Sequence, residues 1–319
     1  MAVYTEVSEV ALSRHLEQYD IGAVLSLKGI AGGVENTNYL LHTEAGEYIL
    51  TLYEKRVAKE DLPFFIGLMD HLAHNEFNCP KPIRMRSGEA LGELEGRPAC
   101  IVSFLEGMEV SYPKSEHAFR AGVTLACLHQ AATGFSIKRK NALGPNGWQP
   151  LFEDNIDRAD EVEAGLEHLL RSQLPDITSQ WPDNIPTGVI HADFFKDNVF
   201  FLNGDVSGVI DFYFACNDLL AYDLAIAINA WCFDKELAFQ RDLATAIVSG
   251  YQSIRPLEEA EFQALPLLAR AAALRFLLTR LNDWLHVPED ALVIPHDPKA
   301  FSARLRFFAA ISDPTEMGA

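Results

Sequence analysis

The sequence predicts an α+β protein of two lobes, with a small lobe built on an antiparallel sheet over residues 1–105 and a larger, mostly helical lobe over residues 106–319. Three observations predict this fold. Two strand–turn–strand patterns lie in the first third of the chain, and apolar residues at helical spacing dominate the remainder. A single further hairpin, with polar residues at its open end, interrupts the helical part. A chain of 319 residues is long enough to build two such lobes.

The elements of the small lobe are predicted from apolar periodicity and from the residues that end each run. Ser8 is a favourable N-cap for the first helix, and Ala45-Gly46 provides a turn between two strands. Pro80 and Pro82 end the second helix, because proline removes a backbone donor. In order, the predicted elements are a helix (8–19), a strand (23–30), a hairpin (38–43 and 47–53), a helix (59–75) and two further strands (89–94 and 98–105).

The larger lobe is predicted to be helical because apolar residues recur with a 3.6-residue period through most of it. Residues 141–150 are an exception, since this stretch is rich in glycine and proline and predicts a loop. The predicted helices cover residues 115–133, 151–170, 218–231, 236–253 and 257–285.

The polar residues of the chain are most concentrated around the hairpin of the larger lobe. A short apolar run ends at Ile190 and is followed at once by His191 and Asp193. Asn198 then opens a second apolar run, which turns at residues 203–205 and returns to Asp211. If the loop is Gly204-Asp205, Asn198 lies opposite Asp211; if it is Asn203-Gly204, Asn198 faces Val209. In both registers an amide oxygen and a carboxylate meet at the open end of the hairpin.

These side chains favour phosphoryl transfer. Carboxylate and amide oxygens are the ligands that Mg²⁺ prefers, and this ion keeps room for phosphate oxygens. Asp193 is therefore expected to accept the proton of an attacking hydroxyl, while Asn198 and Asp211 hold the metal against the nucleotide phosphates. Each residue alone also suits an ordinary turn or strand end, but an Asp, an Asn five residues later and an Asp after the hairpin together follow the kinase template.

A second candidate lies in the turn AGGVENTNYL of the small lobe, at Gly32, Gly33, Asn36 and Thr37. Small residues between two strands allow backbone N–H groups to approach phosphate oxygens. The alternative is a plain hairpin turn. Because the chain also carries the kinase pattern at residues 191–211, nucleotide binding is the favoured interpretation of this turn.

HADFFKDN followed by VIDF resembles the catalytic motifs of the aminoglycoside phosphotransferase and choline kinase superfamily, whose members are relatives of protein kinases. The segments GGVENTNYLL, YILTLYEKR and IDFYFACNDLLAYDLAIAINAWC are similar to bacterial homoserine kinases of the kinase-like type, and the similarity extends over roughly residues 7–308. This resemblance implies a two-lobe, protein-kinase-like fold. It also implies that ATP and Mg²⁺ are used to phosphorylate L-homoserine to O-phospho-L-homoserine in threonine biosynthesis.

The resemblance also implies roles for individual residues. His191 belongs to the catalytic motif, and the segment from Ser103 to Leu105 corresponds to the hinge whose backbone holds the adenine. Asp223, in the YDLA segment, is expected to brace the catalytic loop close to the substrate, and His129 matches a structural histidine of the family.

Two positions leave alternatives open. Most kinases present a basic residue on the second strand of the first hairpin, where this chain has Thr51; Lys55 or Arg56 takes over that charge, or both are solvated loop cations. Arg275 or Arg280 is expected to hold the carboxylate of an amino-acid substrate, because guanidinium binds carboxylate through two hydrogen bonds. The alternative for these arginines is a salt bridge between the lobes.

Composition limits the partners and the compartment. A net charge of −19 argues against a nucleic-acid partner. The N-terminus lacks an export signal, and arginines interrupt the most apolar stretch, residues 265–281, so no membrane partner is expected. The five cysteines form no CxxC pair and predict reduced thiols in a cytoplasmic protein. The expected partner is a small-molecule substrate, with the chain a monomer or a homodimer.

Three other functions remain open at this stage. A sister kinase that acts on choline, methylthioribose or an aminoglycoside has the same core. A metal-dependent hydrolase could use His191, Asp193 and Asp211, but it works without ATP. A non-catalytic nucleotide-binding module is suggested by the missing strand lysine at Thr51.

Overall fold

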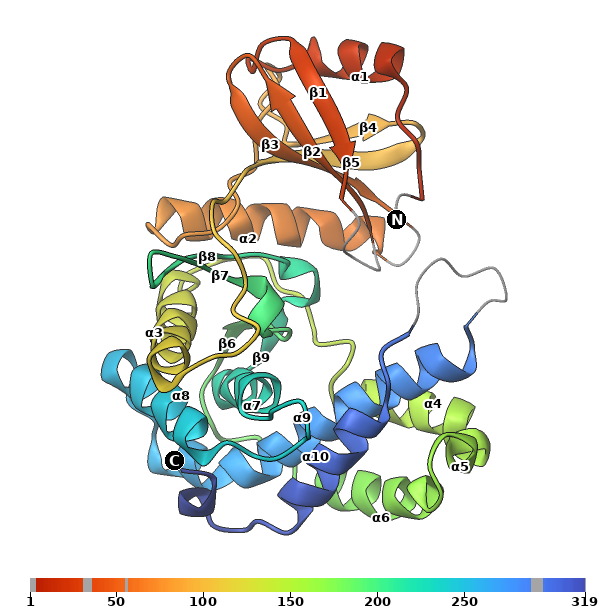
Figure 1. The fold of residues 1–319 in the computed structure, drawn as a ribbon, viewed down its shortest axis with the longest axis vertical. Coiled ribbons are helices and arrows are strands. Elements are labelled where there is room, and N and C mark those ends of the chain that lie inside the picture. Colours follow the sequence, from red (N-terminus) through yellow and green to blue (C-terminus); the bar gives the residue numbers. More distant parts are fainter. Residues whose placement is uncertain (1–3, 31–35, 55–56, 288–294, 319) are drawn as a thin grey trace.

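The computed structural model describes residues 4–30, 36–54, 57–287 and 295–318. Its N-terminal part is a five-stranded antiparallel sheet that stands above a helical part, and the two are joined by a single extended segment after β5 (Figure 1). In spatial order the strands are β1 (Val24–Gly29), β2 (Asn36–Thr43), β3 (Gly46–Tyr53), β5 (Arg97–Ser103) and β4 (Leu91–Leu94).

One helix packs on each face of this sheet. The helix α1 (Glu9–Leu16) begins where the Ser8 hydroxyl accepts a hydrogen bond from the Ala11 N–H, as its N-cap role predicts. Its buried residues form a small core with one face of the sheet. The helix α2 (Leu62–His74) follows a short turn, Lys59–Asp61, and covers the other face. The predicted small-lobe elements are therefore confirmed, except that the first hairpin turns at Glu44-Ala45, since Thr43 pairs with Gly46.

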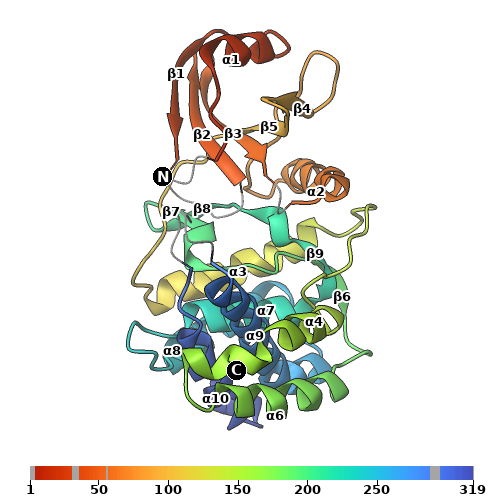
Figure 2. The same cartoon turned by 90° about the vertical axis from the view of Figure 1, so that its right-hand side faces the viewer.

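The larger part contains most of the helices and two short pairs of strands (Figure 2). Strand β6 (Thr187–Ile190) pairs with β9 (Cys216–Leu219), and β7 (Val199–Leu202) pairs with β8 (Asp205–Val209). The helices are α3 (Ser115–Ala131), α4 (Pro145–Asn155), α5 (Ala159–Val162), α6 (Leu166–Ser179), α7 (Leu220–Trp231), α8 (Arg241–Ile254), α9 (Glu259–Leu285) and α10 (Lys299–Ala309), with short turns at Ile156–Arg158, Lys196–Asn198, Phe212–Phe214 and Pro314–Met317.

The loop predicted over residues 141–150 is wrong in its second half. Pro145 starts α4, because proline suits the first helical position, where its missing N–H has no partner to lose. Trp148, inside this helix, is fully buried and donates a hydrogen bond to the Leu143 carbonyl. The predicted acid-rich helix of residues 151–170 is correspondingly divided among α4, α5 and α6.

The helices α3 and α8 are in close contact through glycine. A Cβ atom at Gly122 would lie 2.0 Å from the Ile247 carbonyl oxygen, and one at Gly250 would lie 2.1 Å from the Phe119 carbonyl oxygen. Side chains would collide with backbone at both places, so the two helix backbones touch only because these positions lack a Cβ.

The helix α9 runs through the middle of the helical part. It is long and apolar enough to cross a membrane, but 67% of its most apolar window is buried inside the protein. Its apolar character is therefore that of a core helix. The large core around it continues upward through α2 to Tyr53, Cys100 and Val102 on the sheet. Four of the five cysteines are buried, and all five are free thiols.

Candidate active site

The candidate catalytic loop follows β6 and connects it to β7, on the side of the helical part that faces the sheet (Figure 2). Asp193 lies in this loop with its side chain 20% exposed. The Asn198 amide Nδ2 donates to the Asp193 backbone carbonyl at 2.9 Å and to the carboxylate Oδ2 at 3.1 Å. The expected Asp and Asn are thus in direct contact, and the amide fixes the direction of the carboxylate.

A cation lies on the other side of the same carboxylate. Arg275 Nη1 is 3.9 Å from Asp193 Oδ1, and its guanidinium group stacks over the ring of Phe276 at 3.8 Å. Burial raises the pKa of the Asp193 carboxyl to about 7, and the nearby charge of Asp211 adds to this, whereas Arg275 and Asn198 act in the opposite direction. A carboxyl group with a pKa in this range suits proton transfer near neutral pH.

The β7–β8 hairpin has a register between the two predicted ones. Its loop is Asn203-Gly204, with φ of 54° and 89°, which is the backbone of a type I′ turn. An irregularity at Phe200/Phe201 shifts the pairing by one residue, and the Ile210 N–H donates to the Asn198 carbonyl at 3.0 Å. Asn198 is therefore opposite Ile210 and one residue from Asp211, so both lie at the open end of the hairpin as expected.

His191 is fully buried and both of its ring nitrogens have partners. Nε2 lies 2.9 Å from the Ile210 carbonyl oxygen, and Nδ1 accepts a hydrogen bond from the Asp193 N–H at 3.2 Å. Burial lowers the pKa of the imidazole, so the ring is neutral and donates from Nε2. The ring ties the catalytic loop to the end of β8 and does not face open space, which points to a positioning role.

Asp223 lies beneath the loop, on α7, with no exposed surface. Its Oδ2 accepts from the His191 N–H at 2.7 Å and its Oδ1 from the Ala192 N–H at 2.9 Å. His129 Nε2 is 3.0 Å from Oδ2 as well. Ala192 has a φ of 62°, a left-handed conformation that costs energy in a non-glycine residue. The Asp223 carboxylate holds this strained peptide in place and does not face a substrate.

The residues predicted to contact the nucleotide are only partly described. Gly32 and Gly33 lie outside the described residues. Asn36 and Thr37 are buried, and their side chains bond to Glu54: Asn36 Oδ1 accepts from its N–H at 3.3 Å, and the Thr37 hydroxyl donates to its carboxylate at 2.9 Å. Thus neither side chain points to open space, and any nucleotide contact at these positions is left to the backbone.

Lys55 and Arg56, the candidates for the missing strand lysine, also lie outside the described residues. Thr51 stands at the strand position where most kinases have a basic residue. It is buried, and its hydroxyl donates a hydrogen bond to Asn38 Oδ1 at 2.8 Å.

The predicted hinge runs between the two parts of the chain. The strand β5 ends at Ser103, whose N–H donates to the Lys81 carbonyl. Leu105 lies against β8, where a Cβ at Gly208 would be 2.8 Å from its Cδ1 atom. Within the described part of the chain, the backbone of Leu105 makes no hydrogen bond and is available to a ligand.

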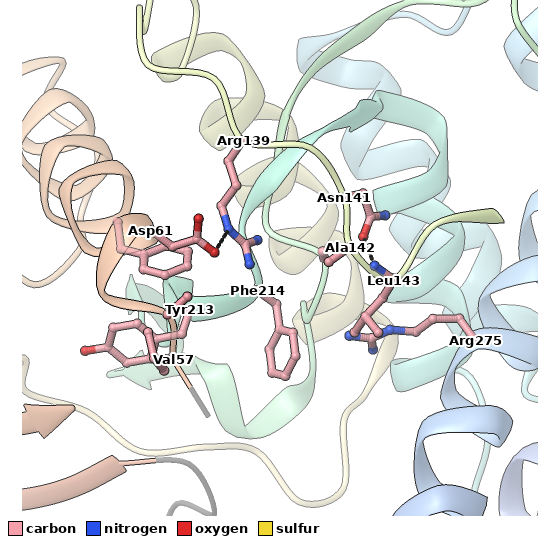
Figure 3. Close-up of a pocket in the computed structure, with 12 residues that line it drawn as sticks. Val57, Asp61, Arg139, Asn141, Ala142, Leu143, Tyr213, Phe214 and Arg275 are labelled. Atoms are coloured by element: carbon pink, nitrogen blue, oxygen red, sulfur yellow. Dashed lines mark hydrogen bonds and ion pairs between the residues drawn. The ribbon is translucent and has the colours of Figure 1, made fainter. Parts of the chain in front are cut away.

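A pocket of about 200 Å³ opens beside the catalytic loop, between α2 and the loop that precedes α4 (Figure 3). Ala192, Tyr213, Phe214 and Arg275 contribute to its wall. A second arginine, Arg139, forms the opposite side. Ala192, the chain neighbour of Asp193, lines this pocket, whose volume is below the range for drug-sized ligands and suits a smaller molecule.

Arg139 was not predicted as a site residue. Its Nε donates to Asp61 at 2.7 Å, its Nη1 donates to the Ala215 carbonyl, and its guanidinium group stacks on Phe65 (Figure 3). A salt bridge between the two parts of the chain is the alternative role considered for Arg275 and Arg280. Arg139 makes such a salt bridge instead. Only its place in a run of three basic residues marked it in the sequence, and such a run is typical of a solvated loop.

Arg280 does not join Arg275 at the Asp193 carboxylate. It stacks on Phe301 of α10 at 4.5 Å. Burial lowers the pKa of its guanidinium group to about 10.

The donor chemistry of the loop fits a hard cation. The described residues contain no group of three or more His, Cys, Asp or Glu side chains that could form a metal cage. The side-chain N–H₂ group of Asn198 donates to Asp193, so its side-chain oxygen Oδ1 is the atom that can coordinate a cation. Asp211, one residue beyond the partner of Asn198 in the hairpin, has an exposed carboxylate. Two oxygen ligands, completed by water and phosphate, suit Mg²⁺ better than a transition metal.

Comparisons with known proteins show the family to which this chain belongs. A model of the phosphotransferase enzyme family matches residues 26–257. The chain is 54% identical to the homoserine kinase of Agrobacterium fabrum and 56% identical to that of Methylobacterium radiotolerans, over 318 residues in each case. Each match covers 100% of this chain and 99% of the relative.

Solved structures of lower identity share the fold. An amicoumacin kinase, determined in complex with AMP-PNP, Ca²⁺ and Ami, has a TM-score of 0.70 at 14% identity, over 98% of this chain and 93% of its own. A spectinomycin phosphotransferase has a TM-score of 0.69 at 15% identity, over 98% of both chains. The choline kinase of Cryptosporidium parvum has a TM-score of 0.69 at 12% identity, over 94% of both chains. The two-lobe kinase-like architecture predicted from the sequence is thereby confirmed.

Proposed function

The chain belongs to the phosphotransferase enzyme family, and from this premise we propose that it transfers the γ-phosphoryl group of ATP to the side-chain hydroxyl of L-homoserine. The products are O-phospho-L-homoserine and ADP, and the first of these serves threonine biosynthesis. The relatives that support this acceptor are full-length homoserine kinases with more than half of their residues identical to this chain.

The single observation that carries the reaction type is the contact between Asp193 and Asn198. The protein raises the pKa of the Asp193 carboxyl group, and the amide of Asn198, five residues later, fixes its direction. Phosphoryl transfer to a hydroxyl requires this arrangement. Asp193 accepts the proton of the homoserine hydroxyl as its oxygen attacks the γ-phosphorus. The bond to the bridging oxygen breaks, and ADP leaves with that oxygen.

We assign Mg²⁺ to Asn198 and Asp211, on the strength of their oxygen donors. When bound, this ion would neutralise charge on the β- and γ-phosphates. Asp211, which follows β8, has a φ of 63°, so the backbone turns sharply there, and the residue is exposed. The amide of Asn198 then serves two groups, with its nitrogen on Asp193 and its oxygen toward the cation.

The nucleotide is expected to lie under the sheet, with its adenine at the backbone from Ser103 to Leu105 and its phosphates at the segment from Gly32 to Thr37. The free backbone of Leu105 supports the first position. His191 and Asp223 act as positioning residues, because both hold the backbone of the catalytic loop and neither touches open space.

The division into a nucleotide-binding lobe (1–105) and a catalytic lobe (106–319) follows from the same assignment. The relatives that share more than half of their residues with this chain are homoserine kinases, and we place this chain in the cytoplasm with homoserine as its partner. A monomer or a homodimer is equally compatible with a site built from one chain.

The test is a panel of acceptors assayed for ADP release in the presence of ATP and Mg²⁺. The panel contains L-homoserine, L-serine, choline, methylthioribose and an aminoglycoside. We expect acceptor-dependent ADP release with L-homoserine, and ³¹P NMR identifies the phosphate ester. A higher kcat/KM with choline, methylthioribose or the aminoglycoside would instead favour a sister kinase, and ATP binding with no acceptor-dependent ADP release would favour a non-catalytic module.

A further inference from the structure

Two guanidinium groups from separate helices lie against one ring of α10, and Lys196 of the catalytic loop is near enough to Arg304 for their charges to interact. Lys196 comes from the catalytic loop, Arg280 from α9 and Arg304 from α10. The guanidinium groups of Arg280 and Arg304 both stack on the ring of Phe301, at 4.5 and 4.3 Å, and Arg304 also lies 5.1 Å from the ring of Phe233. We call these three residues the basic cluster.

The basic cluster has no acidic partner within the part of the chain that the structure describes. None of the ion pairs between described residues involves Lys196, Arg280 or Arg304, and the buried Nε of Arg304 has no hydrogen-bond partner. Asp193 is the acid that acts most strongly on the charge of Arg280, but its carboxylate already lies beside Arg275 and Asn198; Asp197 and Asp297 also act on Arg280 and are exposed. Among the described residues no acid acts on Arg304, and a half-buried cation without a counter-charge is costly, so an anion from outside the chain is the missing component.

The titration of these groups agrees with that conclusion. Burial lowers the pKa of Arg280 and of Arg304 to about 10, and for Arg304 the charge of Arg280 adds to this effect. The charge of Arg280 therefore disfavours the charge of Arg304, and a bound anion would relieve both burial and repulsion.

The cluster is connected to the catalytic carboxylate by a stack of rings. Phe301 stacks on Phe276, with centroids 5.0 Å apart and planes at 26°. Phe276 in turn lies under the guanidinium group of Arg275, which contacts Asp193. Lys196 is three positions after Asp193 in the same loop. The cluster thus belongs to the acceptor side of the site, away from the sheet.

We propose that Arg280 and Arg304, assisted by Lys196, bind the α-carboxylate of the acceptor and select amino acids over amines. This inference rests on the proposed function and deepens it. Both guanidinium groups lie against the ring of Phe301, at 4.5 and 4.3 Å, which holds two sets of N–H donors near one place, and guanidinium binds a carboxylate through two hydrogen bonds. A cationic acceptor without a carboxylate, such as choline, meets three positive charges there and is rejected.

The experiment compares L-homoserine with 3-amino-1-propanol, which keeps the hydroxyl and the amino group but lacks the carboxylate. In Arg280→Gln and Arg304→Gln, we expect the KM for L-homoserine to rise about 10- to 100-fold, the range for a lost charge-assisted hydrogen bond. The KM for 3-amino-1-propanol and for ATP should change by less than about twofold. Arg304→Lys keeps the charge and should recover part of the loss.

Arg306→Gln is the matched control, because Arg306 lies on the same helix but pairs with Glu163 on the other side. It should leave the KM for L-homoserine as in the unmodified protein. Thermal unfolding of each variant separates loss of binding from loss of folding. The proposal is overturned if both glutamine variants keep the KM for L-homoserine, or if they raise the KM for both acceptors equally.

Calorimetric binding of L-2-aminobutyrate, an amino acid with no hydroxyl to phosphorylate, separates this inference from the proposed function. If the protein does not phosphorylate homoserine but binds L-2-aminobutyrate through these arginines, the function is wrong and the carboxylate site stands. If homoserine is phosphorylated but both glutamine variants bind L-2-aminobutyrate like the unmodified protein, the function stands and the carboxylate site is wrong.

Discussion

His129 and Asp223 are 94 positions apart in the chain, yet His129 Nε2 lies 3.0 Å from Asp223 Oδ2 and neither side chain has any exposed surface. The other nitrogen of His129 lies 2.8 Å from the Tyr251 hydroxyl, which in turn accepts from Arg255. A buried chain of hydrogen bonds therefore connects α8 with the backbone of the catalytic loop.

Asp223→Asn should destabilise the protein and slow catalysis together. The amide places an N–H₂ group where the carboxylate accepts hydrogen bonds from His191 and Ala192, and each unsatisfied buried donor costs roughly 1–3 kcal/mol. We expect this loss in the free energy of urea unfolding, with a lower kcat for homoserine. Asp242→Asn, at an exposed position of α8, is the control and should change stability by less than about 0.5 kcal/mol. Unchanged stability of Asp223→Asn would contradict the assigned role.

Asp211→Ala should remove the metal dependence of catalysis along with most of the activity. Because Asp211 is the proposed carboxylate ligand of Mg²⁺, we expect kcat to fall about 100-fold or more at saturating Mg²⁺. The measurement is initial rate against Mg²⁺ concentration. Asp205→Asn is the matched control, since this acid lies in the same hairpin but pairs with Arg120. An Asp211→Ala variant that keeps its activity would rule out the assigned metal site.

Asp193→Asn should change how stability depends on pH. The pKa of Asp193 is raised by burial to about 7 from an ordinary value of 3.8, so between these two values the folded protein binds a proton that the unfolded chain has lost. Asp193 therefore makes the folded state progressively less stable as pH rises through this window, and its removal abolishes that contribution. We expect the stability of Asp193→Asn relative to the unmodified protein to increase from pH 4 to about pH 7 and then to level off.

This comparison is made by urea unfolding without ATP or metal. A difference in stability between the two proteins that is constant from about pH 4 to pH 8 would show that the Asp193 carboxyl has an ordinary pKa.

Gly250→Ala should be strongly destabilising although it adds only a methyl group. The new Cβ would lie 2.1 Å from the Phe119 carbonyl oxygen, so α3 and α8 must separate. Overpacking of this kind costs about 1–3 kcal/mol or more, measured as a lower midpoint of thermal unfolding. Gly144→Ala serves as the control, because its nearest neighbour would be 3.5 Å away, an ordinary contact. An unchanged midpoint for Gly250→Ala would mean that the two helices pack less closely.

The sequence predicted the elements whose signals are local. Ser8 caps α1 as expected, and Asn203-Gly204 forms the turn of the central hairpin. The contact of Asp193 with Asn198 also follows from their spacing in one loop. The glycine- and proline-rich stretch at Pro145 predicts a loop, but it forms a helix, because proline is also favoured at the start of a helix.

Other features depend on contacts between distant segments and leave no trace in the spacing. The irregularity at Phe200/Phe201 shifts the hairpin register by one residue, and no residue type marks it. The pairing of Arg139 with Asp61 joins positions 78 apart. Helical spacing places Arg275 and Arg280 about 140° apart on their helix, but it does not show which of them faces the site. The position of Arg280 on Phe301 arises only when α10 folds against α9.

The continuous core that runs from α2 into the helical part has a consequence for protein engineering. Because the aromatic side chains of α2 pack against residues such as Phe135 and Tyr213, a chimera that takes its first third from one enzyme and the remainder from another joins two surfaces of unmatched shape. A folded chimera therefore requires the aromatic residues that face α2 to be transplanted together with the sheet.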